Sequence, residues 1–104
     1  RQVTFNEYTK KLLKTVYDNL EEIDEIISDN LTKWKNTRLP KTMLAILRLA
    51  VAELKYFPEI PIKVSINEAL ELSKIYGTEE DGSFINGVLG SVCKKYEFVK
   101  NAEE

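Results

Sequence analysis

The stretch PKTMLAILRLAVAELKYF, residues 40–57, decides how the rest of the chain must fold. Apolar side chains recur along it at steps of three and four, the spacing of one helical face: Leu44, Leu47, Val51 and Leu54. Other apolar residues widen that face on both sides: Met43, Ile46, Leu49 and Ala50. A helix that is apolar on nearly every side is buried, so we expect the remaining chain to cover it.

Both ends of this helix are marked by proline. Pro40 suits a first helical turn, where its missing N–H is not needed, and Pro58 cannot continue the helix. The run is too short for a membrane span, and it carries Arg48 and Glu53. We therefore predict a buried helix of a globular protein, with four residues inaccessible to solvent: Leu47, Ala50, Val51 and Leu54.

Two shorter helices are predicted before the central one. The first is capped by Thr4 or Asn6 and turns apolar side chains inward at helical spacing: Phe5, Tyr8, Leu12, Leu13, Val16 and Leu20. Asn19 and Glu22 have the spacing of a capping box that opens the second helix. The apolar stripe of that helix consists of Ile23, Ile26, Ile27 and Leu31.

A fourth helix is predicted after a rigid elbow at residues 58–61, PEIP. Ser65 and Glu68 form the capping-box pattern S-x-x-E, which predicts a helix over residues 66–76. One face of this helix carries Ile66, Ala69, Leu70, Ser73 and Tyr76. Gly77 is a natural stop at its end.

Thr78 and Asp81 repeat the capping pattern and open a last helix. Its inward residues are predicted to be Phe84, Ile85, Val88, Leu89, Val92, Cys93 and Tyr96. Gly87 and Gly90 each cost about 1 kcal/mol inside a helix, which suggests that another backbone approaches closely there. The sequence thus predicts an all-α fold, a compact bundle of about five helices.

Composition limits the class of protein. The chain has 104 residues, enough for one small domain, and 43% of them are hydrophobic, so it can bury a core. A net charge of −2 excludes a generally basic nucleic-acid-binding domain. No signal peptide or membrane segment is recognisable, which indicates a cytoplasmic protein. The single cysteine, Cys93, cannot form an internal disulfide and is expected to be a core residue.

The residue types exclude most catalytic chemistry. The chain has no histidine, so neither a Ser-His-Asp nor a Cys-His arrangement can form. The acidic run from Asp18 to Asp29 is interpreted as a complement to a helix N-terminus, because magnesium and calcium need ligands that converge from a shaped loop. We therefore expect a helical binding module with no catalytic residues, no metal and no cofactor.

One segment allows two interpretations. TKWKNTRL, residues 32–39, is a basic connection with a tryptophan, Trp34. Its ring could stack on a base while Lys33, Lys35 and Arg38 hold phosphates. The alternative, which the usual burial of tryptophan favours, is that Trp34 packs on the core and the charges are solvated.

Three segments occur in a specific order and spacing: LAILRLAVAEL at 44–54, IPIKVSINEALELSKIYGTE at 60–79 and FINGVLGSV at 84–92. Together they resemble the NusB family of transcription antitermination factors. The resemblance implies an all-helical fold of two packed helical bundles. It also implies binding of boxA RNA together with NusE, a small-subunit ribosomal protein, within an RNA polymerase elongation complex that reads through terminators.

The sequence departs from the family pattern at its start. Family members begin with two helices, the first rich in arginine, whereas this chain enters directly what resembles the family's third helix. We therefore expect residues 1–104 to form a single NusB-like helical domain that lacks those two helices and part of the RNA contact. An apolar groove left open by their absence is expected to favour a homodimer or aggregation.

The resemblance also assigns roles to individual residues. The expected RNA contacts are Lys63, Tyr76 and Phe84. The expected contacts to the protein partner are Glu80, Asp81 and Phe84. The turn between the last two helices is expected to bring the two aromatic rings together beside the lysine, although the phenylalanine ring could equally be core. Residues of the motif proper are expected to find partners inside the fold, with direct contact to RNA or NusE as the alternative: Arg48, Asn67, Glu68 and Asn86.

Two other functions stay open at this point. NusB-like domains also occur as the N-terminal part of ribosomal RNA cytosine methyltransferases, where a parallel α/β region follows. This sequence ends in a polar tail at Glu104, which favours a free-standing factor. The other alternative is a non-catalytic helical interaction module that binds no RNA, which a binding assay at low salt would distinguish.

Overall fold

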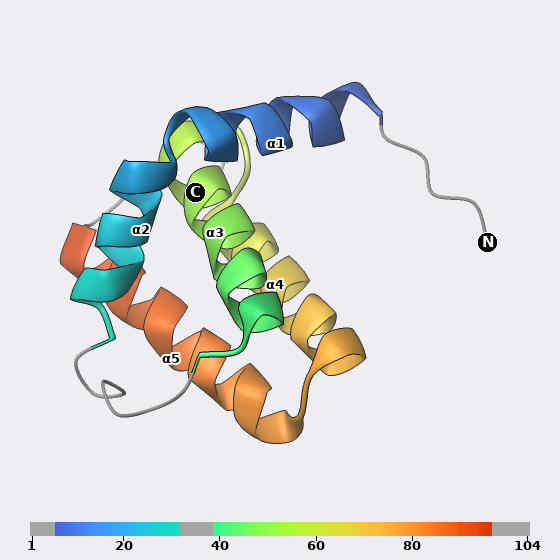
Figure 1. Ribbon diagram of the computed structural model, residues 1–104, viewed down its shortest axis with the longest axis vertical. Coiled ribbons are helices and arrows are strands. Elements are labelled where there is room, and N and C mark those ends of the chain that lie inside the picture. Colours follow the sequence, from blue (N-terminus) through green and yellow to red (C-terminus); the bar gives the residue numbers. More distant parts are fainter. Residues whose placement is uncertain (1–5, 32–38, 97–104) are drawn as a thin grey trace.

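The computed structural model describes residues 6–31 and 39–96 and folds them into five helices (Figure 1). In chain order they are α1 (Glu7–Asp18), α2 (Leu20–Asp29), α3 (Lys41–Tyr56), α4 (Ile62–Tyr76) and α5 (Glu79–Tyr96). The described residues contain no strand, and the predicted all-α fold is confirmed. None of the helices within these ranges is long and apolar enough to cross a bilayer.

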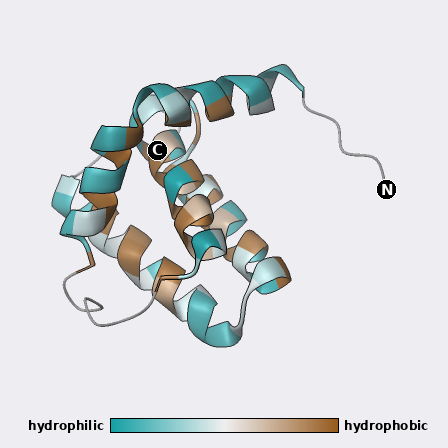
Figure 2. Cartoon of the chain, viewed as in Figure 1, coloured by the Kyte–Doolittle hydropathy of each residue, from teal (hydrophilic) through white to brown (hydrophobic). Residues whose placement is uncertain are grey.

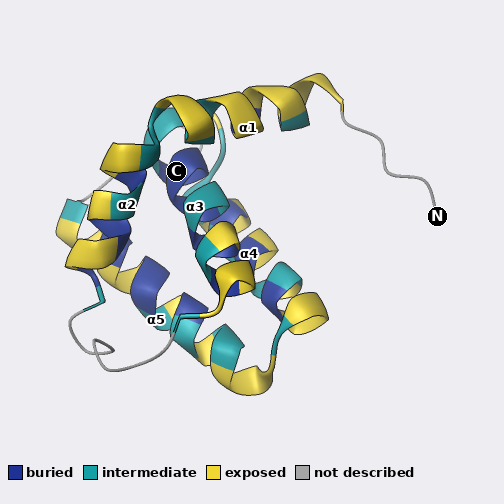
Figure 3. Ribbon diagram, viewed as in Figure 1, coloured by how far each residue is buried: buried dark blue, intermediate teal, exposed yellow. Residues whose placement is uncertain are grey.

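The helix over residues 41–56, α3, lies at the centre of the fold, and all four other helices pack against it (Figure 1). Helix α1 crosses its C-terminal end, while α4 runs along its length. Figure 3 shows α3 as the most continuously buried element. The four residues predicted to be inaccessible are at most 3% exposed: Leu47, Ala50, Val51 and Leu54. The central-helix prediction is therefore confirmed.

Each surrounding helix contributes to one shared core. The buried residues outside α3 include Leu12 of α1, Ile23, Ile26 and Ile27 of α2, Ala69 of α4, and Ile85, Val88, Leu89 and Val92 of α5. Figure 2 shows these apolar faces turned inward and hydrophilic faces turned outward, above all on α1 and α2. The helical periodicity read from the sequence thus places the core stripes of α2 and α5 correctly.

The first helix matches its prediction only in part. Asn6 is its N-cap, with Oδ1 accepting the Thr9 N–H at 2.8 Å. Leu12 is buried, but Leu13 is 47% exposed and Tyr8 is 39% exposed, so the predicted inward face is too wide. The other two residues assigned to this helix start, Thr4 and Phe5, lie outside the described residues.

The predicted capping box at the start of α2 is wrong. The Asn19 side chain makes no capping bond to α2; its Nδ2 instead donates to the Thr15 carbonyl at 2.8 Å and closes α1. Glu22 accepts a hydrogen bond from the Tyr56 hydroxyl of α3. The Glu22 carboxylate therefore bonds to a residue of another helix, and not to the start of α2 as its spacing from Asn19 had predicted.

The predicted start of α4 is also wrong. This helix begins at Ile62, four residues before Ile66, with Pro61 at its N-cap in an extended conformation. Ser65 therefore lies inside the helix and is buried, so the S-x-x-E pattern caps nothing. Proline has no N–H that would need a hydrogen-bond partner at a helix start. The segment 58–61 therefore leads directly into the helix at Ile62.

Candidate functional site

The turn between α4 and α5 is closed by a reciprocal capping box. The Thr78 N–H donates to Asp81 Oδ2 at 2.9 Å, and the Asp81 N–H donates to Thr78 Oγ1 at 3.2 Å. The capping pattern predicted for this helix is confirmed. Because both backbone donors of the turn are satisfied locally, the first turn of α5 is held in a fixed position against the end of α4.

Gly77, just before this box, is needed because its neighbours leave no room for a side chain. A Cβ atom built at Gly77 would lie 2.5 Å from Asp81 Oδ2 and 3.0 Å from Met43 Cε of α3. The Gly77 backbone itself is extended, with φ at −142°, which any residue can adopt. The glycine therefore serves close packing of α4, α5 and α3 at this corner.

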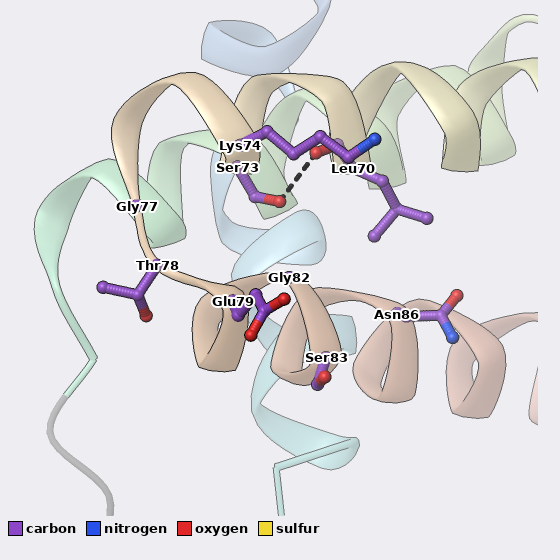
Figure 4. A pocket seen from close by; sticks show the side chains of 9 residues that line it. All are labelled: Leu70, Ser73, Lys74, Gly77, Thr78, Glu79, Gly82, Ser83 and Asn86. Atoms are coloured by element: carbon purple, nitrogen blue, oxygen red, sulfur yellow. Dashed lines mark hydrogen bonds between the residues drawn. The ribbon is translucent and has the colours of Figure 1, made fainter.

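A groove of about 400 Å³ runs from this turn along α4 and α5 (Figure 4). We call it the α4–α5 groove. It is lined by Leu70, Ser73, Lys74, Gly77, Thr78, Glu79, Gly82, Ser83 and Asn86. Ser73 lies at its base, where Oγ donates to the Leu70 carbonyl at 2.7 Å. The groove is therefore open, polar at its rim and built from two rigid helices.

A second hollow of about 420 Å³ adjoins the groove and is lined by Lys63, Ile66, Asn67 and Leu70. Leu70 belongs to both, so the two hollows follow one line along α4. The α4 residues on that line are spaced by four, three and four: Lys63, Asn67, Leu70 and Lys74. We call this line the α4 stripe. Eleven residues of helix separate its two lysines by roughly 16 Å along the axis.

The charges of this surface are divided between its two helices. Lys63 and Lys74 are exposed on α4, and the contact of 3.4 Å between Lys74 and Glu71 is itself exposed and of little energetic weight. The first turn of α5 instead carries Glu79, Glu80 and Asp81, where acids favour the helix dipole. The groove thus presents cations along α4 and anions at the end that the turn closes.

The structure places the two predicted aromatic contacts in different surroundings. Tyr76 is 63% exposed and lines a hollow between α3 and α4, together with Ala45 and Leu49. Phe84 is half-buried and packs against the hydrophobic core. Lys63 lines neither the Tyr76 hollow nor the core, so the three residues do not converge on one pocket of the described structure.

The two predicted acidic contacts also differ from each other. Glu80 is exposed on the first turn of α5. The Asp81 side chain is half-buried and its Oδ2 is engaged by the Thr78 N–H. Of the pair, Glu80 is the carboxylate that faces solvent without a capping role.

The four motif residues separate into two groups. Arg48 finds its partner inside the fold, as expected: its Nε and a terminal nitrogen each lie 2.8 Å from an Asp24 carboxylate oxygen, which joins α3 to α2. Asn67 and Asn86 are exposed and border the two hollows, so an internal role is wrong for both. Glu68 lies beside Glu53 of α3, and burial, followed by the charge and hydrogen bonding of Glu53, raises the pKa of Glu68.

Sequence reasoning missed most of the residues that line the groove, among them Lys74, Thr78 and Ser83. Lys74 had a usable signal, because it lies seven residues after Asn67 on the predicted helix and therefore on the same face. The polar residues of α5 had none, since their position against α4 depends on the turn. The basic segment with Lys33, Trp34, Lys35 and Arg38 lies outside the described residues, and both of its interpretations stay open.

A small all-helical domain with an open groove along α4 and α5 is the class that this structure defines. Residues 2–94 match the model of the NusB family, and the chain belongs to that family. It is 52% identical to the transcription antitermination protein NusB of Clostridium botulinum (strain Kyoto / Type A2). The alignment extends over 86 residues, or 83% of this chain. The chain is 46% identical over 88 residues to the protein of the same name from Listeria monocytogenes serotype 4b, which covers 85% of it.

A solved structure supports the same assignment. The chain superposes on T. maritima NusB with a TM-score of 0.78 and 42% sequence identity, over 86% of this chain and 63% of that one. The matched region amounts to 60% of the Clostridium botulinum relative and 69% of the Listeria relative. The chain thus spans somewhat less than two thirds of the Clostridium and T. maritima proteins.

Proposed function

We propose that this chain acts in transcription antitermination, binding boxA-type single-stranded RNA jointly with a NusE-type ribosomal protein and joining an RNA polymerase elongation complex. The name shared by the curated relatives, transcription antitermination protein, supports the general role. The α4 stripe is the single structural observation that carries the RNA part, because it sets two cations and an amide along an open groove. The proposed activity is binding, without catalysis.

We propose that RNA lies along the α4 stripe. Lys63 and Lys74 would hold phosphates, and Asn67 and Asn86 would offer amide donors and acceptors to base edges. Tyr76, exposed at the end of α4, is the ring available for stacking on an unpaired base. Phe84 contributes from its half-buried position as a supporting residue beneath the surface.

We propose that the protein partner contacts the first turn of α5. Glu80 is the leading candidate, because carboxylates repel phosphate and its side chain is exposed. Asp81 would act mainly by holding the turn in place through its capping bonds. RNA and partner would then occupy adjacent parts of one continuous surface.

Charge reversal on the α4 stripe tests the RNA part. We expect Lys63→Glu and Lys74→Glu each to weaken boxA RNA binding in the presence of NusE and to reduce the salt slope by about one, because one fewer counterion is released. Lys10→Glu, at an exposed lysine of α1, is the matched control and should leave the slope unchanged. Equal slopes in the parent and both α4 variants would refute this site and move attention to residues 32–38.

Reversal of an acid tests the partner part. We expect Glu80→Lys to weaken NusE binding while changing the affinity for RNA alone much less. Glu21→Lys, in the first turn of α2, is the matched control on another face. If both variants bind NusE equally well in a titration calorimeter, the first turn of α5 is not the partner site.

A further inference from the structure

Three exposed polar side chains of α5 line the α4–α5 groove: Glu79, Ser83 and Asn86. None of these side chains makes a hydrogen bond or ion pair within the described part of the chain. Their spacing of four and three residues sets them along one face of α5 (Figure 4). Because the capping box fixes the start of α5, this row has a defined position against α4. The groove therefore presents hydrogen-bonding groups that are available to a ligand.

The remaining surface of the groove is suited to a flat ring. Leu70 of α4 contributes an apolar side chain, and Gly82 of α5 contributes only backbone. A glycine lets another group approach the backbone more closely than a residue with a side chain does. The volume of about 400 Å³ lies within the range of small-molecule sites. The groove can therefore admit one unstacked base of a single-stranded nucleic acid.

Glu79 narrows the choice of base. A carboxylate repels phosphate, so it is not suited to holding an RNA backbone. It only accepts hydrogen bonds, and it does so on two neighbouring oxygens. Guanine offers two adjacent donors, N1–H and the N2 amino group, whereas adenine and cytosine each offer a single amino group. A bidentate pair with Glu79 would therefore favour guanine.

The next two residues of the row match the other edge of the same base. Ser83 lies one helical turn after Glu79, a spacing that places Cβ atoms about 5–6 Å apart. In guanine, O6 is adjacent to N1, so a hydroxyl beside the carboxylate can donate to O6. Asn86, a further turn along, can donate from its amide to N7. The three groups thus follow the order of the guanine donors and acceptors.

We propose that the α4–α5 groove is a guanine-binding subsite for single-stranded RNA. Glu79 accepts N1–H and N2–H, Ser83 donates to O6 and Asn86 donates to N7. The ring lies between the Leu70 side chain and the backbone at Gly82. This inference rests on the RNA binding proposed above and adds a base preference to it.

Four nonaribonucleotides test the preference with the whole chain and the NusE-type protein present. Each consists of uridine with one central guanosine, inosine, adenosine or cytidine, and fluorescence anisotropy at a single salt concentration gives the affinities. We expect the guanosine oligonucleotide to bind about five- to tenfold more tightly than those with adenosine or cytidine. Inosine, which lacks the N2 amino group, should fall between them. Binding without a preference for guanosine would overturn this inference and leave the proposed RNA binding intact, whereas no binding of any oligonucleotide would overturn both.

Variants assign the preference to the groove. We expect Glu79→Gln to lower the ratio of guanosine to adenosine affinity below about twofold, because a carboxamide has one acceptor oxygen in place of two. A ratio is used because the substitution also removes a charge, which acts on all four oligonucleotides alike. Ser83→Ala should weaken the guanosine oligonucleotide about threefold and leave the adenosine one unchanged.

Glu21→Gln is the matched control, since it changes an exposed acid in the first turn of another helix, α2. It should keep the full preference for guanosine. If Glu79→Gln keeps that preference as well, the groove is not the subsite. If Glu79→Gln instead weakens binding of the NusE-type protein while the ratio stays unchanged, the groove belongs to the protein partner, and the proposal is likewise overturned.

Discussion

At position 77 the need for glycine comes from the neighbouring side chains and not from the backbone angles of the residue itself. A Cβ atom at this position would lie 2.5 Å from Asp81 Oδ2, the atom that accepts the Thr78 N–H. We expect Gly77→Ala to push that carboxylate away from its capping position and to lower the free energy of unfolding by about 0.5–2 kcal/mol, the range for a lost helix cap. Urea denaturation followed by circular dichroism measures the loss.

Gly82, one turn further on, is the control for this prediction. A Cβ there would lie 3.4 Å from Ser73 Oγ, which is close to ordinary contact. Alanine is also the better helix former by about 1 kcal/mol. Gly82→Ala should therefore not destabilise the fold, and a loss equal to that of Gly77→Ala would show that the cap is not the cause.

Glu68 gives a pH dependence whose sign follows from its neighbours. Its pKa is raised above the ordinary 4.5, first by burial and then by Glu53, so the folded state holds this proton more tightly than the unfolded chain does. Between 4.5 and the raised pKa, stability contributed by this group is therefore lost as pH rises, and above that pKa the loss is constant. We expect Glu68→Gln to remove this dependence.

Urea midpoints from pH 4 to pH 7 test this expectation. The variant's midpoint minus the parent's should grow with pH and then level off. Glu71→Gln provides the comparison, since its carboxylate is exposed beside Lys74. A difference between Glu68→Gln and the parent that does not vary with pH would contradict the assignment.

At the scale of elements, the sequence was sufficient to predict that the helices exist, but it was not sufficient to predict where some of them begin. Apolar periodicity and the prolines at 40 and 58 located α3, and the Thr78–Asp81 pair located α5. The capping patterns at Asn19 and Ser65 failed, because each side chain meets a different environment in the fold. Local spacing cannot distinguish a helix start from a buried helix interior.

Gly90 of α5 corrects another expectation drawn from local pattern. The cost of a helical glycine suggested a close neighbour, yet a Cβ at Gly90 would meet no atom within 4 Å. We therefore expect Gly90→Ala to raise the free energy of unfolding by about 0.8–1 kcal/mol. Chemical denaturation measures this gain; a loss would mean that something does pack on this position.

At the scale of the whole molecule, stability depends on a core that all five helices share. Leu47 of α3 is fully buried within it. We expect Leu47→Ala to lower the free energy of unfolding by about 2–5 kcal/mol, the cost of removing a buried leucine side chain. Leu13→Ala, at a 47% exposed position of α1, should cost less than about 1 kcal/mol. Urea titration of both variants provides the comparison, and similar losses would argue against a single central core.

The candidate site was predictable only where one helix carries it. Asn67 and Lys74 could be placed on one face of the predicted helix over residues 66–76, whereas Lys63 joins that face only because α4 begins at Ile62. The contact of Glu53 with Tyr8 and Glu68 could not be predicted, because Tyr8 and Glu53 are 45 residues apart in the sequence. Likewise, nothing in the sequence pairs Asn30, the C-cap residue of α2, with Ser91 of α5, whose hydroxyl donates to it at 2.6 Å. Such contacts depend on how helices meet, which periodicity does not determine.

The central position of α3 also has a consequence during synthesis on the ribosome. Translation completes α3 at Tyr56, but the two helices that cover much of it end only at Tyr76 and Tyr96. At about 5–20 residues per second, the roughly 40 residues from the end of α3 to the end of α5 take about 2–8 s to be added. For that interval α3, the most apolar of the described helices, lacks the cover that α4 and α5 give it in the finished fold. The nascent chain is therefore most open to chaperone binding, and to aggregation, after α3 is complete and before α4 and α5 have been added.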